Sequence, residues 1–77
     1  MPMYKDYGVV ASGLSLADRG RPGHYIPFAS VFTWSEGAFR LARQFTWTDE
    51  EQTSADAAKA MAHRLAQRAI DCGEVGG

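Results

Sequence analysis

Histidine and cysteine are the residue types most able to bind a metal or to serve as a catalytic base or nucleophile, and the chain holds three of them: His24, His63 and Cys72. Zinc in proteins takes four nitrogen, sulfur or oxygen ligands in a tetrahedral array. On one helix His63 and Cys72 lie about 180° apart, since each residue advances by about 100°, so they cannot share a site. The same geometry argues against a Cys–His nucleophilic pair. The sequence therefore predicts no metal site.

The other potentially reactive residues are not arranged for catalysis. The serines lack the G-x-S-x-G context of a nucleophile elbow. The acidic residues 49–51 form a turn, where solubility and helix initiation are their expected roles. Gly20-Arg21-Pro22-Gly23 is too short for a phosphate-binding loop. With no acid, base and nucleophile converging, we expect neither enzyme activity nor a cofactor. A small enzyme would need a pocket that brings His24 or His63 near a carboxylate.

Aromatic and basic side chains in the middle of the chain are the candidates for binding. As an exposed patch they would bind a protein or another copy of the chain; the alternative places the aromatics in the core. Basic side chains beside aromatics also suit single-stranded nucleic acid, but nine acidic against eight basic residues favour a solvated, salt-bridged face. The basic residues in question are Lys5, Arg19, Arg21, Arg40 and Arg43. The candidate interaction surface comprises Tyr25, Phe28, Trp34, Arg40, Arg43 and Trp47.

The composition is that of one small globular domain. The chain has 77 residues, 45% of them hydrophobic and 22% charged, with a net charge of −1. This balance gives no whole-chain attraction to nucleic acid or to anionic membranes. A single cysteine fits a reducing compartment, and neither a signal peptide nor a membrane-spanning stretch of about 20 apolar residues is evident, so we expect a cytoplasmic protein. The core should cover about residues 4–72, and we expect residues 73–77 to form a flexible tail.

Residues 53–72 predict one amphipathic helix around which the chain is organised. Thr53 or Ser54 provides the N-cap, and Gly73 suits the left-handed position after the helix end. The apolar stripe is Ala55, Ala58, Met61, Ala62, Leu65, Ala69 and Cys72. Because most of these residues are alanines, the helix should lie close to a partner that supplies the bulk, which we expect to be an aromatic-rich sheet.

The upstream segments predict three strands, over residues 4–12, 24–34 and 38–47. Residues 13–23 form a loop, and Ser35-Glu36-Gly37 form a three-residue connection built on a type I turn. Pro27 indicates that the second strand is bulged or at an edge there. The fold class is therefore α+β: a three-stranded antiparallel sheet with one C-terminal helix on one face, a β-β-β-α two-layer sandwich.

The face patterns of the second and third strands differ. Both faces of residues 24–34 are apolar, so one face must be core and the other must leave apolar surface exposed. In residues 38–47 the large apolar side chains fall on one face together with Arg43, and a bulge between Leu41 and Phe45 would swing Arg43 out. The shared face comprises Phe39, Leu41, Arg43, Phe45 and Trp47.

The order of these signals resembles a group of small bacterial proteins of undetermined function. The matching residues are Tyr4-Lys5-Asp6-Tyr7, with Asp6 where that group has glycine, then Tyr25-Ile26-Pro27, and the pair Ile70-Asp71 at the helix end. The resemblance implies the β-β-β-α fold and no particular activity. The topology is also similar to part of double-stranded-RNA-binding domains and of HicB-type antitoxins, an analogy of fold alone.

These observations predict a non-enzymatic protein-interaction or self-association module. The surface used would be the sheet face that the helix leaves uncovered, or an edge strand. The partner would be an unknown protein or a second copy. The alternative is a nucleic-acid-binding module of double-stranded-RNA-binding-like topology, whose affinity would fall steeply with salt.

Overall fold

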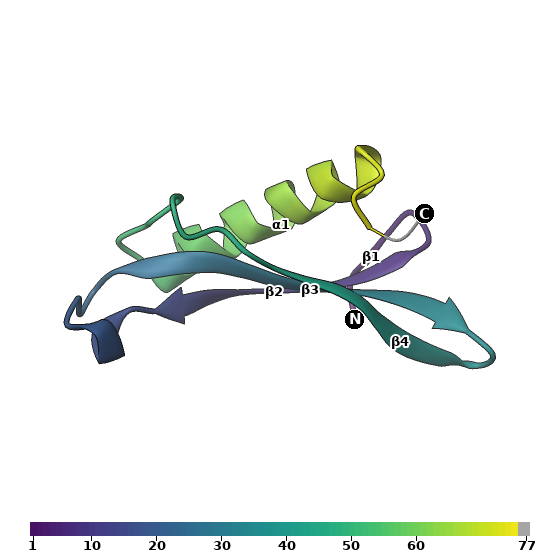
Figure 1. Cartoon of the computed structure of the whole chain (residues 1–77), viewed down its shortest axis with the longest axis horizontal. Coiled ribbons are helices and arrows are strands. Elements are labelled where there is room, and N and C mark those ends of the chain that lie inside the picture. The colour runs from purple at the N-terminus through teal and green to yellow at the C-terminus, as the bar shows by residue number, and fades with distance from the viewer. Residues whose placement is uncertain (76–77) are drawn as a thin grey trace.

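The computed structural model describes residues 1–75 of the chain. Its elements are β1 (Met3–Tyr4), β2 (Tyr7–Ser15), the 3-10 turn η1 (Ala17–Arg19), β3 (Tyr25–Ser35), β4 (Ala38–Thr46) and α1 (Ala55–Asp71). The strands form one antiparallel sheet in the order β1-β2-β3-β4, and α1 lies across one face of it (Figure 1). The α+β class with a C-terminal helix on one sheet face is confirmed, but the sheet has four strands and not three.

The additional strand comes from a hairpin within residues 4–12. Tyr4 pairs with Tyr7, so the chain reverses at Lys5 and Asp6. Lys5 has a φ of 54°, a left-handed conformation that glycine or asparagine adopts more readily than lysine. Because neither of those residues marks this turn, the sequence pattern missed it. The prediction of one continuous strand over residues 4–12 is wrong.

β2 continues to Ser15, so the loop expected over residues 13–23 begins later than predicted. Gly13 is part of the strand and lies where the sheet meets the start of α1. A Cβ at Gly13 would lie 2.7 Å from the carbonyl oxygen of Ala55 and 3.0 Å from the Cβ of Ala58. This glycine therefore allows a close approach of helix and strand.

β3 is a central strand even though it contains Pro27. The amide of Trp47 donates a hydrogen bond to the carbonyl oxygen of Pro27. In an antiparallel ladder the nitrogen and oxygen of a residue face the same neighbour, so the proline nitrogen points just beyond Thr46, where β4 ends. The missing N–H thus costs the sheet no ladder bond on that side.

The β3–β4 connection is a two-residue turn, not the predicted three-residue loop. Ser35 pairs with Ala38, and Glu36 and Gly37 have φ values of 52° and 79°. Two successive positive φ angles indicate a type I′ turn, whose twist matches that of the flanking strands.

A β-bulge interrupts β4. The alternation of side chains between the two sheet faces is therefore offset by one residue across the bulge. Val31 pairs with Arg43, but the next residue of β3, Phe32, pairs with Leu41, so Ala42 is extra. The prediction that Phe39 and Leu41 share a face with Arg43, Phe45 and Trp47 is therefore wrong. Arg43 stays with Phe45 on the helix side, and Phe39 and Leu41 lie on the other face.

α1 begins at the N-cap Ser54, whose hydroxyl accepts a hydrogen bond from the amide of Ala57 at 3.0 Å. It ends in a Schellman motif: the amide of Gly73 donates to Ile70 and the amide of Glu74 to Ala69, with Gly73 at a φ of 74°. Cys72, predicted to be buried, is exposed. The buried helix residues are Ala58, Ala62, Ala66, Ala69 and Ile70.

The core lies between α1 and the middle of β2 and β3. The buried alanines of α1 let the helix sit close to the sheet, as expected from the small stripe. Phe45 and Trp47, stacked with ring centroids 5.3 Å apart, pack against the cluster from β4 and the residue after it. Val75 is 2% exposed and packs into the same cluster. The cluster comprises Val9, Ala11, Ala29, Val31, Ala62, Ala66, Ala69, Ile70 and Val75.

Candidate interaction face

The uncovered face is the side of the sheet that points away from α1. Paired residues of an antiparallel ladder share a face, and alternate residues of a strand lie on opposite faces. Val9 and Val31 pack under the helix, so the residues that follow them, Val10 and Phe32, point the other way. Followed across the ladders, the uncovered face consists of Met3, Gly8, Val10, Ser12, Leu14, Ile26, Phe28, Ser30, Phe32, Trp34, Phe39, Leu41, Gln44 and Thr46. Of its large hydrophobic residues, Ile26 is the exception in exposure, since it is buried with 3% of its surface exposed.

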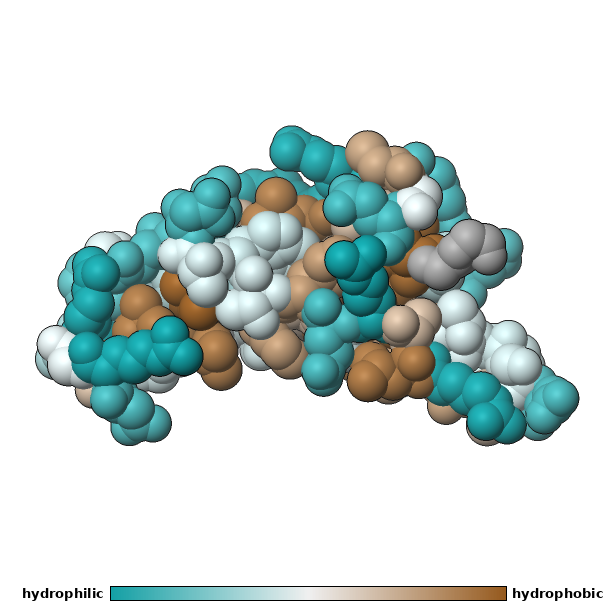
Figure 2. Space-filling view, viewed as in Figure 1, coloured by the Kyte–Doolittle hydropathy of each residue, from teal (hydrophilic) through white to brown (hydrophobic). Residues whose placement is uncertain are grey.

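Every large hydrophobic side chain that is exposed within residues 1–75 lies on or over the uncovered face. Trp34 and Leu41 are 58% and 52% exposed. Met1 precedes β1, and its thioether lies against Gly8. The other members are Met3, Val10, Leu14 and Phe39. In Figure 2 hydrophobic atoms reach the lower border of the molecule, on the side of the sheet opposite α1.

One end of the uncovered face is aromatic. Trp34 and Phe39 are cross-strand partners on the β3–β4 hairpin, and their rings meet edge to face with centroids 4.9 Å apart at 79°. This geometry is a favourable arrangement for aromatic pairs. The tip of the hairpin extends past the end of the sheet region that α1 covers (Figure 1). The rings are thus held in place by each other on a part of the sheet that has no covering layer.

The middle of the uncovered face is polar but uncharged. Ser30 is 8% exposed, and the Nε2 of Gln44, its partner on β4, donates a hydrogen bond to the Ser30 hydroxyl at 3.2 Å. These two groups therefore already satisfy part of each other's hydrogen-bonding capacity. None of the strand residues on this face carries an ionisable side chain.

The fold separates the predicted candidate surface into two parts. Phe28 and Trp34 lie on the uncovered face. The remaining candidates, Tyr25, Arg40, Arg43 and Trp47, lie on the helix side of the sheet or beyond its end. The sequence missed Leu41 and Phe39, because their exposure depends on the bulge at Ala42.

The arginines suggested as a basic patch have separate acidic or carbonyl partners. Arg21 lies 2.8 Å from Glu51, and Arg40 lies 3.5 Å from Glu36. Arg43 donates a 2.6 Å hydrogen bond to the carbonyl oxygen of Glu74 and lies over the Phe45 ring. Three of the four arginines named in the sequence analysis thus each interact with a different partner at a different place in the fold.

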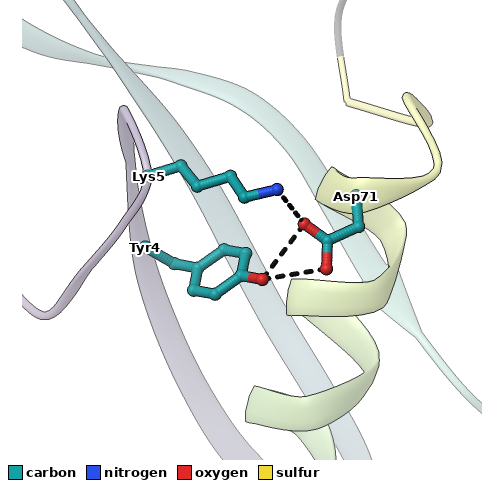
Figure 3. Close-up of polar contacts among 3 residues, drawn as sticks. All are labelled: Tyr4, Lys5 and Asp71. Carbon is teal, nitrogen blue, oxygen red and sulfur yellow. Dashed lines mark hydrogen bonds and ion pairs between the residues drawn. The ribbon is translucent and has the colours of Figure 1, made fainter.

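A polar clamp joins the first hairpin to the end of α1 (Figure 3). The hydroxyl of Tyr4 donates to both carboxylate oxygens of Asp71, at 2.8 and 3.0 Å, and the Lys5 ammonium donates to Oδ1 at 2.5 Å. Nearby, the Tyr7 hydroxyl donates to the carbonyl oxygen of Val75. The fold therefore brings together the first and last short motifs on which the resemblance to the bacterial group rests, residues 4–7 and 70–71.

The clamp shifts the pKa values of Tyr4, Lys5 and Asp71 in the directions that favour the protonation states needed for its hydrogen bonds. The pKa of Asp71 falls below its ordinary value, chiefly because Lys5 and then Tyr4 donate hydrogen bonds to the carboxylate. The pKa values of Tyr4 and Lys5 rise, in each case mainly through the hydrogen bond to Asp71. All three groups are accessible to solvent, so the clamp is a screened surface interaction.

The side chain of His24 lies close to a carboxylate, which is one of the conditions that a small enzyme would need. Its Nδ1 lies 2.8 Å from the Oε1 of Glu51, the same oxygen that Arg21 approaches. The surface formed by residues 1–75 shows no pocket around this pair. Within that range no group of three or more His, Cys, Asp or Glu side chains is arranged to hold a metal ion.

Comparison of the chain with protein-family models, with curated proteins and with solved structures finds no match. In the part of the chain that the structure describes, no helix has the length and apolar character needed to cross a membrane.

Proposed function

We propose that the chain is a non-enzymatic, cytoplasmic interaction module that binds a protein through the uncovered face. One observation carries this proposal: within residues 1–75 the exposed large hydrophobic side chains gather on a single sheet face whose strand residues carry no ionisable side chain. Covering apolar surface is favourable by about 25 cal/mol per Å². An apolar sheet face without its own helix layer is therefore well suited to association.

The contact between His24 and Glu51 fits a structural role. Together with Arg21 it ties the loop after β2 to the segment before α1, and a backbone bridge between Tyr25 and Gln52 reinforces the same junction. These interactions hold the start of α1 against the sheet. They support a role for His24 in positioning the helix, not in catalysis.

Site-specific photocrosslinking in cells that produce the protein tests the proposal. A photoreactive phenylalanine replaces Trp34 on the uncovered face or, as the matched control, the exposed Ala60 on the outer side of α1. We expect a discrete protein adduct from position 34 and little from position 60. Equal adducts from both positions, or none from position 34, would refute the proposal.

Nucleic-acid binding is the second candidate. The observation that favours it is the antiparallel sheet with a C-terminal helix, which fits the topology analogy. The engagement of Arg21, Arg40 and Arg43 by separate partners weighs against it. If the chain binds nucleic acid, a labelled duplex RNA should shift at low salt and be released steeply as salt rises. The absence of a shift at low salt would remove this candidate.

A further inference from the structure

We propose that the occupant of the uncovered face is a second copy of the chain, packed sheet against sheet about a two-fold axis. This inference rests on the proposed function and makes its partner specific. The resulting stack would have two sheets inside and one α1 helix on each outer side. Sheets pack face to face about 10 Å apart with their apolar side chains interdigitated.

The charge pattern of the face favours a second copy. In a two-fold contact the same patch faces itself, so a charged residue near the axis meets its own like charge. The uncovered face avoids this repulsion, because its strand residues include no ionisable side chain. A face without charge also offers no electrostatic complement to a differently charged partner.

The central polar groups keep one hydrogen bond when the face is covered. Ser30 and Gln44 lie in the middle of the face and are hydrogen-bonded to each other. A buried polar group is costly mainly when it loses its partner. Covering this pair leaves their mutual hydrogen bond in place, but the carbonyl oxygen and second N–H of the Gln44 amide then need partners across the interface. The flanking Val10, Phe32 and Leu41 side chains lose contact with water.

The area of the face is close to the lower limit for a dimer. β2, β3 and β4 have 9, 11 and 9 residues, whereas β1 has two. At about 3.3 Å per residue and about 4.8 Å between strands, the face projects on the order of 500 Å². Standard protein interfaces bury about 600 to 1,000 Å² per partner.

Sedimentation equilibrium of the purified chain from about 5 µM to about 1 mM tests the inference. We expect a concentration-dependent dimer. Leu41→Lys places a charge on the face and should weaken dimerisation at least about 100-fold. Ala60→Lys adds the same charge to the exposed side of α1 and should leave the dimer intact. A chain that stays monomeric to about 1 mM overturns the inference, as does equal weakening by both variants.

Unfolding of Leu41→Lys would also abolish dimerisation. A second variant and a second measurement therefore test the same face independently. Trp34→Thr removes an exposed ring while keeping a residue suited to a strand, and should weaken the dimer about 10-fold or more. On dilution of the wild type, amide shifts should change at Val10, Phe32 and Leu41 and remain constant at Lys59. Shifts confined to α1 would overturn the inference.

Failure of this inference is distinguishable from failure of the proposed function. If the purified chain is monomeric but position 34 crosslinks to another protein in cells, the face binds a different partner and the second copy is excluded. If the chain is monomeric and position 34 yields no adduct, both proposals fail.

Discussion

Leu41 and Arg43 are separated by one residue on β4, yet they lie on opposite faces of the sheet, because Ala42 is the extra residue of a β-bulge. Leu41 faces solvent on the uncovered side. Arg43 reaches the segment that follows α1 and binds the Glu74 carbonyl oxygen at 2.6 Å. The bulge thus lets one short edge strand supply both an apolar face and a tether for the C-terminal turn.

Removing the hydrogen bond between Arg43 and the Glu74 carbonyl oxygen, which tethers the C-terminal turn, should lower the free energy of unfolding. Arg43→Ala removes the charged hydrogen bond to Glu74 and the packing over Phe45, so we expect a loss of about 1 kcal/mol in the free energy of unfolding. Arg40→Ala is the matched control on the same strand, since its contact with Glu36 is long and exposed, and should change stability by less than about 0.5 kcal/mol. Urea denaturation compares the two. Equal effects would contradict the tether.

Gly13 and Gly8, both in β2, should respond differently to an added methyl group. In Gly13→Ala the new Cβ meets the backbone oxygen of Ala55, which cannot move without shifting α1. We expect a destabilisation of about 1–3 kcal/mol. In Gly8→Ala the new atom meets the thioether of Met1, the end of a flexible side chain, so the cost should be below about 1 kcal/mol. Thermal or urea unfolding checks this order, and the reverse order would contradict the close helix–strand approach.

The clamp at Asp71 should give stability a defined pH dependence. The carboxylate has a lowered pKa, so its contribution is complete above the ordinary value of 3.8 and is lost as pH falls through the folded value. The pKa values of Tyr4 and Lys5 are raised from 10.0 and 10.5, so their contributions are complete below 10.0 and are lost as pH rises through the folded values. Wild type and Asp71→Asn should therefore differ most between about pH 5 and pH 9.

Urea denaturation at about pH 3, pH 7 and pH 11 measures this difference. Asp18→Asn is the matched control, because Asp18 forms no ion pair within residues 1–75. It should shift stability little at any of these pH values. A constant difference between wild type and Asp71→Asn across the range would exclude the clamp as its source.

The two tryptophans should differ in access to a quencher. Trp34 is exposed at the hairpin tip, whereas Trp47 packs against the core cluster and stacks on Phe45. Acrylamide should quench the Trp47→Phe variant, which retains Trp34, several-fold more strongly than the Trp34→Phe variant. At high protein concentration the quenching of Trp34 should fall as the dimer forms. Equal quenching at low concentration would contradict the described face.

The regular elements of the fold follow from local signals in the sequence. The helix prediction over residues 53–72 is close to Ala55–Asp71, and the prediction over residues 24–34 is within one residue of β3. Capping side chains, alanine content and β-branched or aromatic runs act over a few residues and are visible in the sequence. The apolar character of both faces of residues 24–34 likewise indicated that one sheet face would remain uncovered.

The features that the sequence did not fully predict depend on residues that are close in space but not in sequence. The turn at Lys5 has no glycine or asparagine to mark it. The bulge that the sequence suggests between Leu41 and Phe45 is present, but its position at Ala42 is set by how β4 registers against β3. That register decides that Leu41 and not Arg43 joins the uncovered face. The meeting of Lys5 with Asp71 joins residues 66 positions apart, beyond the reach of periodicity.

The order of the strands has a consequence for the folding kinetics of the chain. Each strand pairs with the next one in sequence, so the sheet can grow through successive hairpins with short loop closures. The bond between Tyr4 and Asp71 spans 67 residues and should form only after the folding transition state. Asp71→Asn should then speed unfolding and leave the folding rate nearly unchanged in a stopped-flow chevron; a comparable slowing of folding would place this contact in the nucleus. We therefore expect the contact between Tyr4 and Asp71 to lengthen the lifetime of the native state without changing the speed of folding.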